Sequence, residues 1–189
     1  PGSSAPWATM TATWSQRNEN TQITEDDPPD TPRQSVISGR GRLEGQFPLG
    51  NAHIDAHVTY ERNKRSEYET ATSEDVATGL YSQTMLADVK LHKTLSTRLS
   101  GVAGVTGLTN WFRKYGEETL IPENRTTAGG AYGFVQSDLG RWQLSGGLRF
   151  DYRHLDVDAD SALGNAAGSD NWASLVGNVG ALHRVSQPV

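Results

Sequence analysis

The stretch WQLSGGLRFDYR, residues 142–153, decides the fold class. Every second residue in it is apolar or glycine, from Trp142 through Leu148 to Tyr152, and the residues between them are almost all polar. Side chains of a β-strand point alternately to opposite faces of a sheet. The period of two therefore predicts a strand with an apolar environment on one side and water on the other.

Similar segments occupy most of the chain. Two show the same clear alternation, 36–47 and 52–61, and five weaker ones bring the predicted strands to eight: 7–15, 79–91, 97–110, 127–138 and 172–185. The predicted connections alternate between short turns, at 48–51, 92–95 and 139–141, and long polar loops, at 15–33, 61–78, 111–125 and 156–171. Every second connection of an up-and-down sheet lies at the same end, so all four long loops are expected together.

Composition excludes several classes of protein. The 189 residues include no cysteine, which excludes a disulfide scaffold and a cysteine-ligated metal site. No apolar run approaches the roughly 18 residues of a transmembrane helix. The net charge of −5 offers no basic footprint for nucleic acid. Twenty glycines and eight prolines disfavour helices, so an all-β chain is predicted.

Alternating strands joined by short turns and long loops are typical of a transmembrane β-barrel. The ten steps from Trp142 to Tyr152 give about 34 Å of strand, or about 26 Å along the membrane normal at a tilt of about 40°, close to the apolar band of such barrels. We expect Trp142 and Tyr152 in the aromatic girdles and the strand to leave the bilayer near His154. A soluble antiparallel sandwich with one solvated face is the alternative, although its strands are usually shorter.

Two stretches carry a resemblance to a family. The first is YGEETLIPENRTTAGGAYGFVQSDLGRWQLSGGLRFDYRHLDVD, residues 115–158, with a loop from Gly-Glu-Glu to Ile-Pro, a short Gly-Arg-Trp turn and a GGLRFDY strand. The second is SGRGRLEGQFPLGNAHIDAHVTYERNKRSEYE, residues 38–69, a hairpin and loop. Together they resemble the barrel of a TonB-dependent outer-membrane receptor, over most of the chain from about residue 7.

The resemblance implies TonB-energised uptake of a scarce nutrient, such as a ferric siderophore, haem, cobalamin or another metal complex, across a Gram-negative outer membrane. It implies no enzymatic activity and no cofactor. The expected partners are outer-membrane lipid, lipopolysaccharide and a metal chelate or similar small ligand, and no nucleic acid. Family members have 22 strands and an N-terminal plug that engages TonB. Residues 1–189 are therefore expected to be an interior part of the barrel, without the plug and the remaining strands.

Two other functions remain open at this stage. The eight strands could close into an autonomous outer-membrane barrel with a structural or adhesive role. The chain could also be a soluble β-module that binds a glycan or a protein. Membrane folding, migration on gels before and after boiling, and solubility in plain buffer separate these alternatives.

Candidate sites are few, and none is catalytic. The long loops as predicted hold seventeen of the 22 acidic residues and eight of the 17 basic ones, a net charge of −9 that would attract cations. His53, Asp55 and His57 share one face of a strand and are of types that bind zinc. Their spacing, about 7 Å between alternate residues, requires help from a neighbouring strand or loop. Glu117 and Glu118 lack a partner for acid–base catalysis.

Two further sets of charged residues are interpreted as follows. Asp156, Asp158 and Asp160 resemble the opening of a calcium loop, but Ser161 and Ala167 stand where that motif has glycine and glutamate. Charged ladders are expected on the wall facing the barrel lumen, where they would hold a plug or line water. Their members are Arg40, Arg42 and Glu44 on one strand and Arg149, Asp151 and Arg153 on another.

Overall fold

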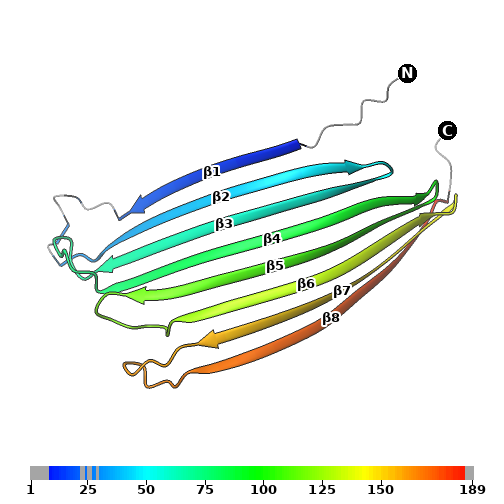
Figure 1. The fold of residues 1–189 in the computed structure, drawn as a ribbon. Coiled ribbons are helices and arrows are strands. Elements are labelled where there is room, and N and C mark those ends of the chain that lie inside the picture. Colours follow the sequence, from blue (N-terminus) through cyan, green and yellow to red (C-terminus); the bar gives the residue numbers. More distant parts are fainter. Residues whose placement is uncertain (1–8, 22–23, 25–26, 29, 186–189) are drawn as a thin grey trace.

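The computed structural model describes residues 9–21, 24, 27–28 and 30–185, which form one antiparallel sheet. Its eight strands lie side by side in the order of the sequence, as Figure 1 shows. They are β1 (Thr9–Asn20), β2 (Arg33–Leu49), β3 (Ala52–Tyr68), β4 (Thr78–Ser96), β5 (Leu99–Tyr115), β6 (Asn124–Asp138), β7 (Trp142–Val157) and β8 (Gly168–His183). The predicted all-β, up-and-down architecture is confirmed. The described residues contain no helix capable of spanning a bilayer.

The strands are longer than the alternation predicts, mainly at the long-loop end. The segment predicted at 52–61 runs as β3 to Tyr68, and the one predicted at 142–153 runs as β7 to Val157. Backbone pairing continues there although the alternation is lost, so a hydropathy pattern cannot detect it. Residues 62–67 of β3 are polar on both faces, and the end of β7 places His154 and Asp156 on the side of the apolar residues and Leu155 and Val157 on the other side. Trp7, predicted to open the first strand, lies outside the described residues.

The turn predicted at 92–95 is wrong. The polar run His92-Lys93-Thr94 looks like a turn in sequence, but these residues belong to β4, and the turn lies at 97–98. His92 is paired with His53 of β3 on one side and with Val102 of β5 on the other. The other two short turns are where the sequence predicts them. Their Gly50 and Gly140 have φ of 62° and 80°, a region that glycine enters without steric cost.

The two faces of the sheet differ sharply in composition. We call polar face the side that carries Arg40, Arg42, Glu44, His53, Asp55, His57, Asp88, Lys90, His92, Arg149, Asp151 and Arg153. We call apolar face the side that carries Ile37, Leu43, Ile54, Val58, Met85, Val89, Leu91, Val105, Val135, Leu144, Leu148, Phe150, Leu175 and Val179. Among the described residues no hydrophobic side chain is buried, and Leu148 and Leu175 are 57% and 66% exposed.

The sheet is open at both edges and uncovered on both faces. Within the described part of the chain, β1 and β8 do not touch, and every strand contacts only its sequence neighbours. The structure therefore contains neither the closed eight-stranded barrel nor the second layer of a soluble sandwich, the two alternatives that the sequence left open. All residues of the two edge strands are exposed.

Candidate functional site on the polar face and at the loop end

The charged ladders predicted for one wall lie on the polar face, and their charges are mostly paired. Arg40 Nε lies 3.0 Å from Glu61 Oε1, and Arg42 Nε lies 2.7 Å from Glu44 Oε2. Other pairs on this face include Arg17–Glu19, Arg65–Glu67, Lys90–Asp88 and Arg149–Asp151, whereas Arg153 lies over the ring of Trp172. Exposed pairs of this kind add little stability, about 0 to 1 kcal/mol each. Their arrangement leaves the polar face hydrophilic and nearly neutral.

Two histidines and one carboxylate converge on the polar face near the short turns. His53 of β3 and His92 of β4 face each other across the strands, with parallel rings 4.4 Å apart. Asp55 Oδ2 lies 3.1 Å from Nε2 of His92 and 3.7 Å from Nε2 of His53. One potential ligand atom from each of the three residues lies within 4.8 Å of the others. Within the described ranges, this is the group of histidines and acids compact enough to hold a metal ion.

The predicted third member, His57, lies outside this cluster. It is paired across the strands with Asp88 instead, at 3.9 Å between Nδ1 and Oδ1. Alternate residues of an extended strand are too far apart to share one ion, whereas directly opposite residues on paired strands have Cβ atoms about 5 Å apart. Sequence reasoning missed His92 because it assigned this residue to a turn. His92 could have been found by treating residues 92–95 as part of an unbroken strand, which puts His92 in register with His53.

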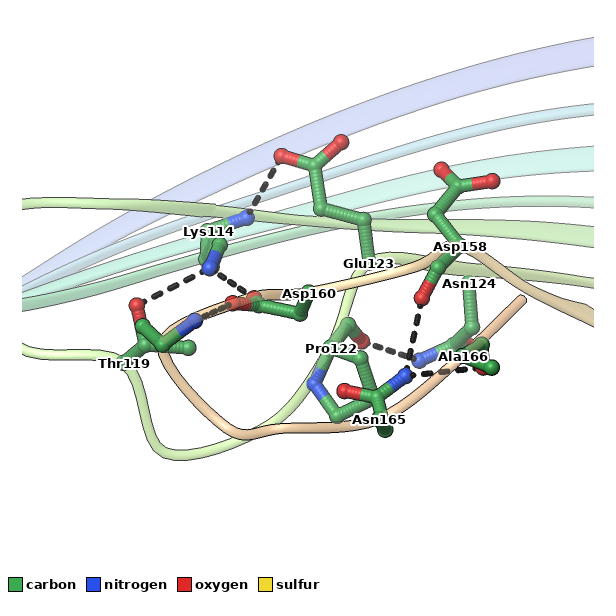
Figure 2. Close-up of polar contacts among 10 residues, drawn as sticks. Lys114, Thr119, Pro122, Glu123, Asn124, Asp158, Asp160, Asn165 and Ala166 are labelled. Carbon is green, nitrogen blue, oxygen red and sulfur yellow. Dashed lines mark hydrogen bonds and ion pairs between the residues drawn. The ribbon is translucent and has the colours of Figure 1, made fainter.

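Contacts between two long loops form a second polar cluster, shown in Figure 2. Lys114 at the end of β5 binds the carboxylate of Asp160 and donates a hydrogen bond to Thr119 Oγ1 at 2.9 Å. The Asp160 carboxyl is largely buried, with a side-chain exposure of 7%. The hydrogen bond from Lys114, with help from the backbone N–H of Ala162, holds the pKa of Asp160 below its usual range. This ion pair ties the loop after β7 to the loop after β5.

The calcium-loop interpretation of Asp156, Asp158 and Asp160 finds no support in this geometry. The Asp160 carboxyl is already bound by Lys114, and Asp156 accepts a hydrogen bond from His154 at 2.9 Å on the opposite face of the sheet. Figure 2 shows the side chain of Asp158 pointing away from Asp160. The backbone carbonyl of Asp158 accepts a hydrogen bond from Asn165 at 3.0 Å. The three carboxylates therefore do not converge on one point.

The long loops are more acidic than the predicted boundaries indicated. The sequence between the observed strands, residues 21–32, 69–77, 116–123 and 158–167, contains twelve of the 22 acidic residues and none of the 17 lysines and arginines. The basic residues that the sequence analysis assigned to these loops belong to the ends of the strands instead. The loop end therefore has a purely acidic rim above strands that carry the cations.

Five of those cations lie on the apolar side of the sheet near the loop end, and one of them, Arg33, donates a hydrogen bond to the backbone oxygen of Ser73. The other four form a group. Arg62, Lys64, Arg113 and Arg125 continue the alternation of the apolar face beyond its last aliphatic residues, and we call them the basic belt. None of them makes an ion pair with another described residue, whereas most polar-face cations do. Aromatic rings of the same face lie beside two of them, with Lys64 Nζ 4.9 Å from the ring of Tyr115 and Arg125 Cζ 5.6 Å from that of Trp111.

Comparison with known proteins identifies the fold but no family. No protein-family model matches the chain, and no curated protein matches it in sequence. The structure is similar to a solved structure of the FrpB iron transporter from Neisseria meningitidis, the F5-1 variant in its apoprotein form, with a TM-score of 0.72 at 13% sequence identity. The match covers 94% of this chain and 31% of the transporter chain, so this chain spans about a third of the protein it matches.

Proposed function

We propose that these strands are part of the wall of an outer-membrane transport barrel, with the apolar face toward lipid and the polar face toward a water-filled lumen. The observation that carries this proposal is the apolar face itself: most of its large side chains are exposed, and the described residues include no buried hydrophobic side chain. An apolar surface spread over eight strands far exceeds the patches that soluble monomers leave uncovered. The hydrocarbon core of a lipid bilayer would shield this surface from water.

The strand lengths fit this placement. Strands of 15 to 19 residues, as in β2 to β8, span roughly 35 to 50 Å along the normal at about 3.4 Å per residue and a tilt of about 40°. This exceeds the apolar band of about 25 Å, so the strands extend into water. Their polar extensions lie at the long-loop end, which is the outer side of such barrels.

The basic belt supports the same orientation. Its four cations, which make no ion pair among the residues that the structure describes, flank the apolar band where the outer ends of the strands would meet charged headgroups. Basic groups close to an anionic membrane surface are attracted to it by about 1 kcal/mol each. We propose anionic lipid, such as the phosphates of lipopolysaccharide, as the partner of the belt.

The acidic rim indicates the class of cargo. Twelve acidic residues without a basic one in the loops create a negative potential at the outer mouth, which raises the local concentration of cationic solutes. The finer proposal is uptake of a metal or metal complex by a TonB-dependent receptor. It is supported by the resemblance of residues 38–69 and 115–158 to that family and by the structural likeness to an iron transporter.

Single-cysteine labelling tests the placement of the wall, because the chain has no cysteine of its own. Leu148→Cys and Arg149→Cys are adjacent in β7 and lie on opposite faces. We expect a water-soluble maleimide to label the Arg149→Cys variant in intact outer membranes and to spare the Leu148→Cys variant, with both labelled after denaturation. Equal labelling before denaturation would contradict a lipid-facing apolar side.

Uptake of radioactive ferric chelates by cells with and without the gene tests the finer proposal. Uptake should fall without the gene, return when the gene is restored and stop when an uncoupler removes the proton-motive force. Unchanged uptake of every metal complex tried would contradict the transport role. It would leave the result of the labelling experiment unaffected.

A further inference from the structure

We propose that His53, Asp55 and His92 form a binding site for one divalent transition-metal ion, of the zinc class, on the polar face. The site joins adjacent strands at the short-turn end, because His53 and Asp55 belong to β3 and His92 belongs to β4. It differs from the acidic rim at the opposite end of the strands. The inference does not require transport, because the ligands are brought together by the register of β3 and β4 alone.

The distances suit a tetrahedral ion. Zinc binds imidazole nitrogen and carboxylate oxygen at about 2.0 to 2.2 Å, so neighbouring ligand atoms lie about 3.3 to 3.5 Å apart around it. Asp55 Oδ2 lies 3.1 and 3.7 Å from Nε2 of His92 and His53, on either side of this value. The largest separation in the group is at most 4.8 Å. Because each imidazole binds a metal in its own ring plane and the two rings are parallel, binding requires the half-exposed His53 ring to rotate out of its stack with His92, which can also shorten this separation.

His92 provides a second indication of a ligand. Its Nε2 is buried and has no hydrogen-bond partner in the described structure, although Asp55 Oδ2 lies 3.1 Å away. A buried nitrogen without a partner is costly, and coordination to a metal ion is a way to satisfy it.

The surroundings of Asp55 are arranged as those of a metal ligand. Gln46 of β2 donates a hydrogen bond to Asp55 Oδ1 at 2.9 Å, which orients the carboxylate and leaves Oδ2 for the histidines. Second hydrogen bonds of this kind fix metal ligands in place. Lys90 is directly opposite Asp55 in register, but its ammonium lies 3.3 Å from Asp88 and so is directed toward another carboxylate. Three protein ligands leave the fourth tetrahedral position open to water or to a ligand carried with the ion.

Metal titration of the full chain in detergent micelles tests the site, with a purification tag that contains no histidine. Zn²⁺ binding is followed by calorimetry, and Co²⁺ serves as an optical probe, since tetrahedral Co²⁺ absorbs strongly in the visible range. We expect one ion per chain. His92→Gln and Asp55→Asn should each weaken binding at least tenfold, the loss typical even for residues that only support metal ligands.

His57→Gln is the matched control, because His57 lies on the same strand and the same face but outside the cluster. We expect it to bind zinc as the unsubstituted chain does. Circular dichroism of all variants verifies that the sheet is formed. Glutamine and asparagine are used as replacements because they are polar and similar in size to the residues they replace. The absence of stoichiometric zinc binding in the unsubstituted chain, or an equal loss in His57→Gln and His92→Gln, would overturn the assignment.

Discussion

The side chains on the polar and apolar faces of this sheet find their interaction partners in different ways. On the polar face most cations have an acidic neighbour on the same or the adjacent strand, so the charges of these cations are balanced within the sheet. On the apolar face the large side chains are exposed, and the cations at its outer edge have no acidic partner among the described residues. The apolar face therefore depends on its surroundings in two ways: its hydrophobic side chains need an apolar environment, and its cations need anionic partners.

The largest effect on stability is expected when a charge is placed on the apolar face. Leu148→Arg places a cation in the middle of the apolar face and should destabilise the protein in lipid by about 2 to 4 kcal/mol. Arg149→Leu, one residue away, removes one side of the ion pair with Asp151 on the hydrated face and should cost less. Urea titration of folding into lipid vesicles measures both free energies. Equal losses at the two positions would remove the distinction between the faces.

Sequence alone predicted the architecture because the signal for it is repeated. Alternation in residues 36–47, 52–61 and 142–153 reports which side faces water, and the same periodicity places each of these segments in the sheet. The ends of the strands could not be predicted in the same way. Both faces of β3 are polar from Arg62 to Glu67, so the continuation of this strand to Tyr68 leaves no trace in hydropathy.

The histidine cluster could be predicted only in part for the same reason. His53 and Asp55 were recognised from their spacing, but the third member depends on the register between strands, which a single sequence does not reveal. His57 was chosen because it is close to His53 and Asp55 in sequence, whereas His92 is close to them in space. The resemblance to a receptor family predicted the fold that the structural comparison supports. It contains no information about this cluster.

A smaller effect is expected at the basic belt. Arg113→Glu combined with Arg125→Glu reverses two of its charges, each worth about 1 kcal/mol near an anionic surface. We expect weaker binding of lipopolysaccharide, measured as the amount that remains with the protein purified in detergent. Arg40→Glu combined with Arg42→Glu is the control, because it makes the same charge change on the polar face. If both double variants lose the lipid equally, the loss reflects net charge and not the belt.

The smallest effect is expected at the loop end, where Lys114 binds Asp160. The pKa of this carboxyl is lower in the folded chain than its ordinary value of 3.8, so the ion pair stabilises the fold above that value. The stabilisation is lost as the pH falls through the lowered pKa, because protonation removes the charge. Lys114→Met should remove it at neutral pH as well. Hydrogen exchange should become faster in residues 116–123 and 158–167, while exchange in the middle of β5 and β7 stays the same.

Asp158→Asn serves as the control for this prediction. Asp158 belongs to the same loop, but its hydrogen bond to Asn165 is made by the backbone carbonyl, which the substitution preserves. Exchange in both loops should therefore match that of the unsubstituted chain. If Lys114→Met leaves exchange unchanged, the two loops are held together by their backbone contacts, such as the bond from Asp158 N to Glu123 O at 2.9 Å. The acidic rim would then keep its shape without the cation that Lys114 supplies from the end of β5.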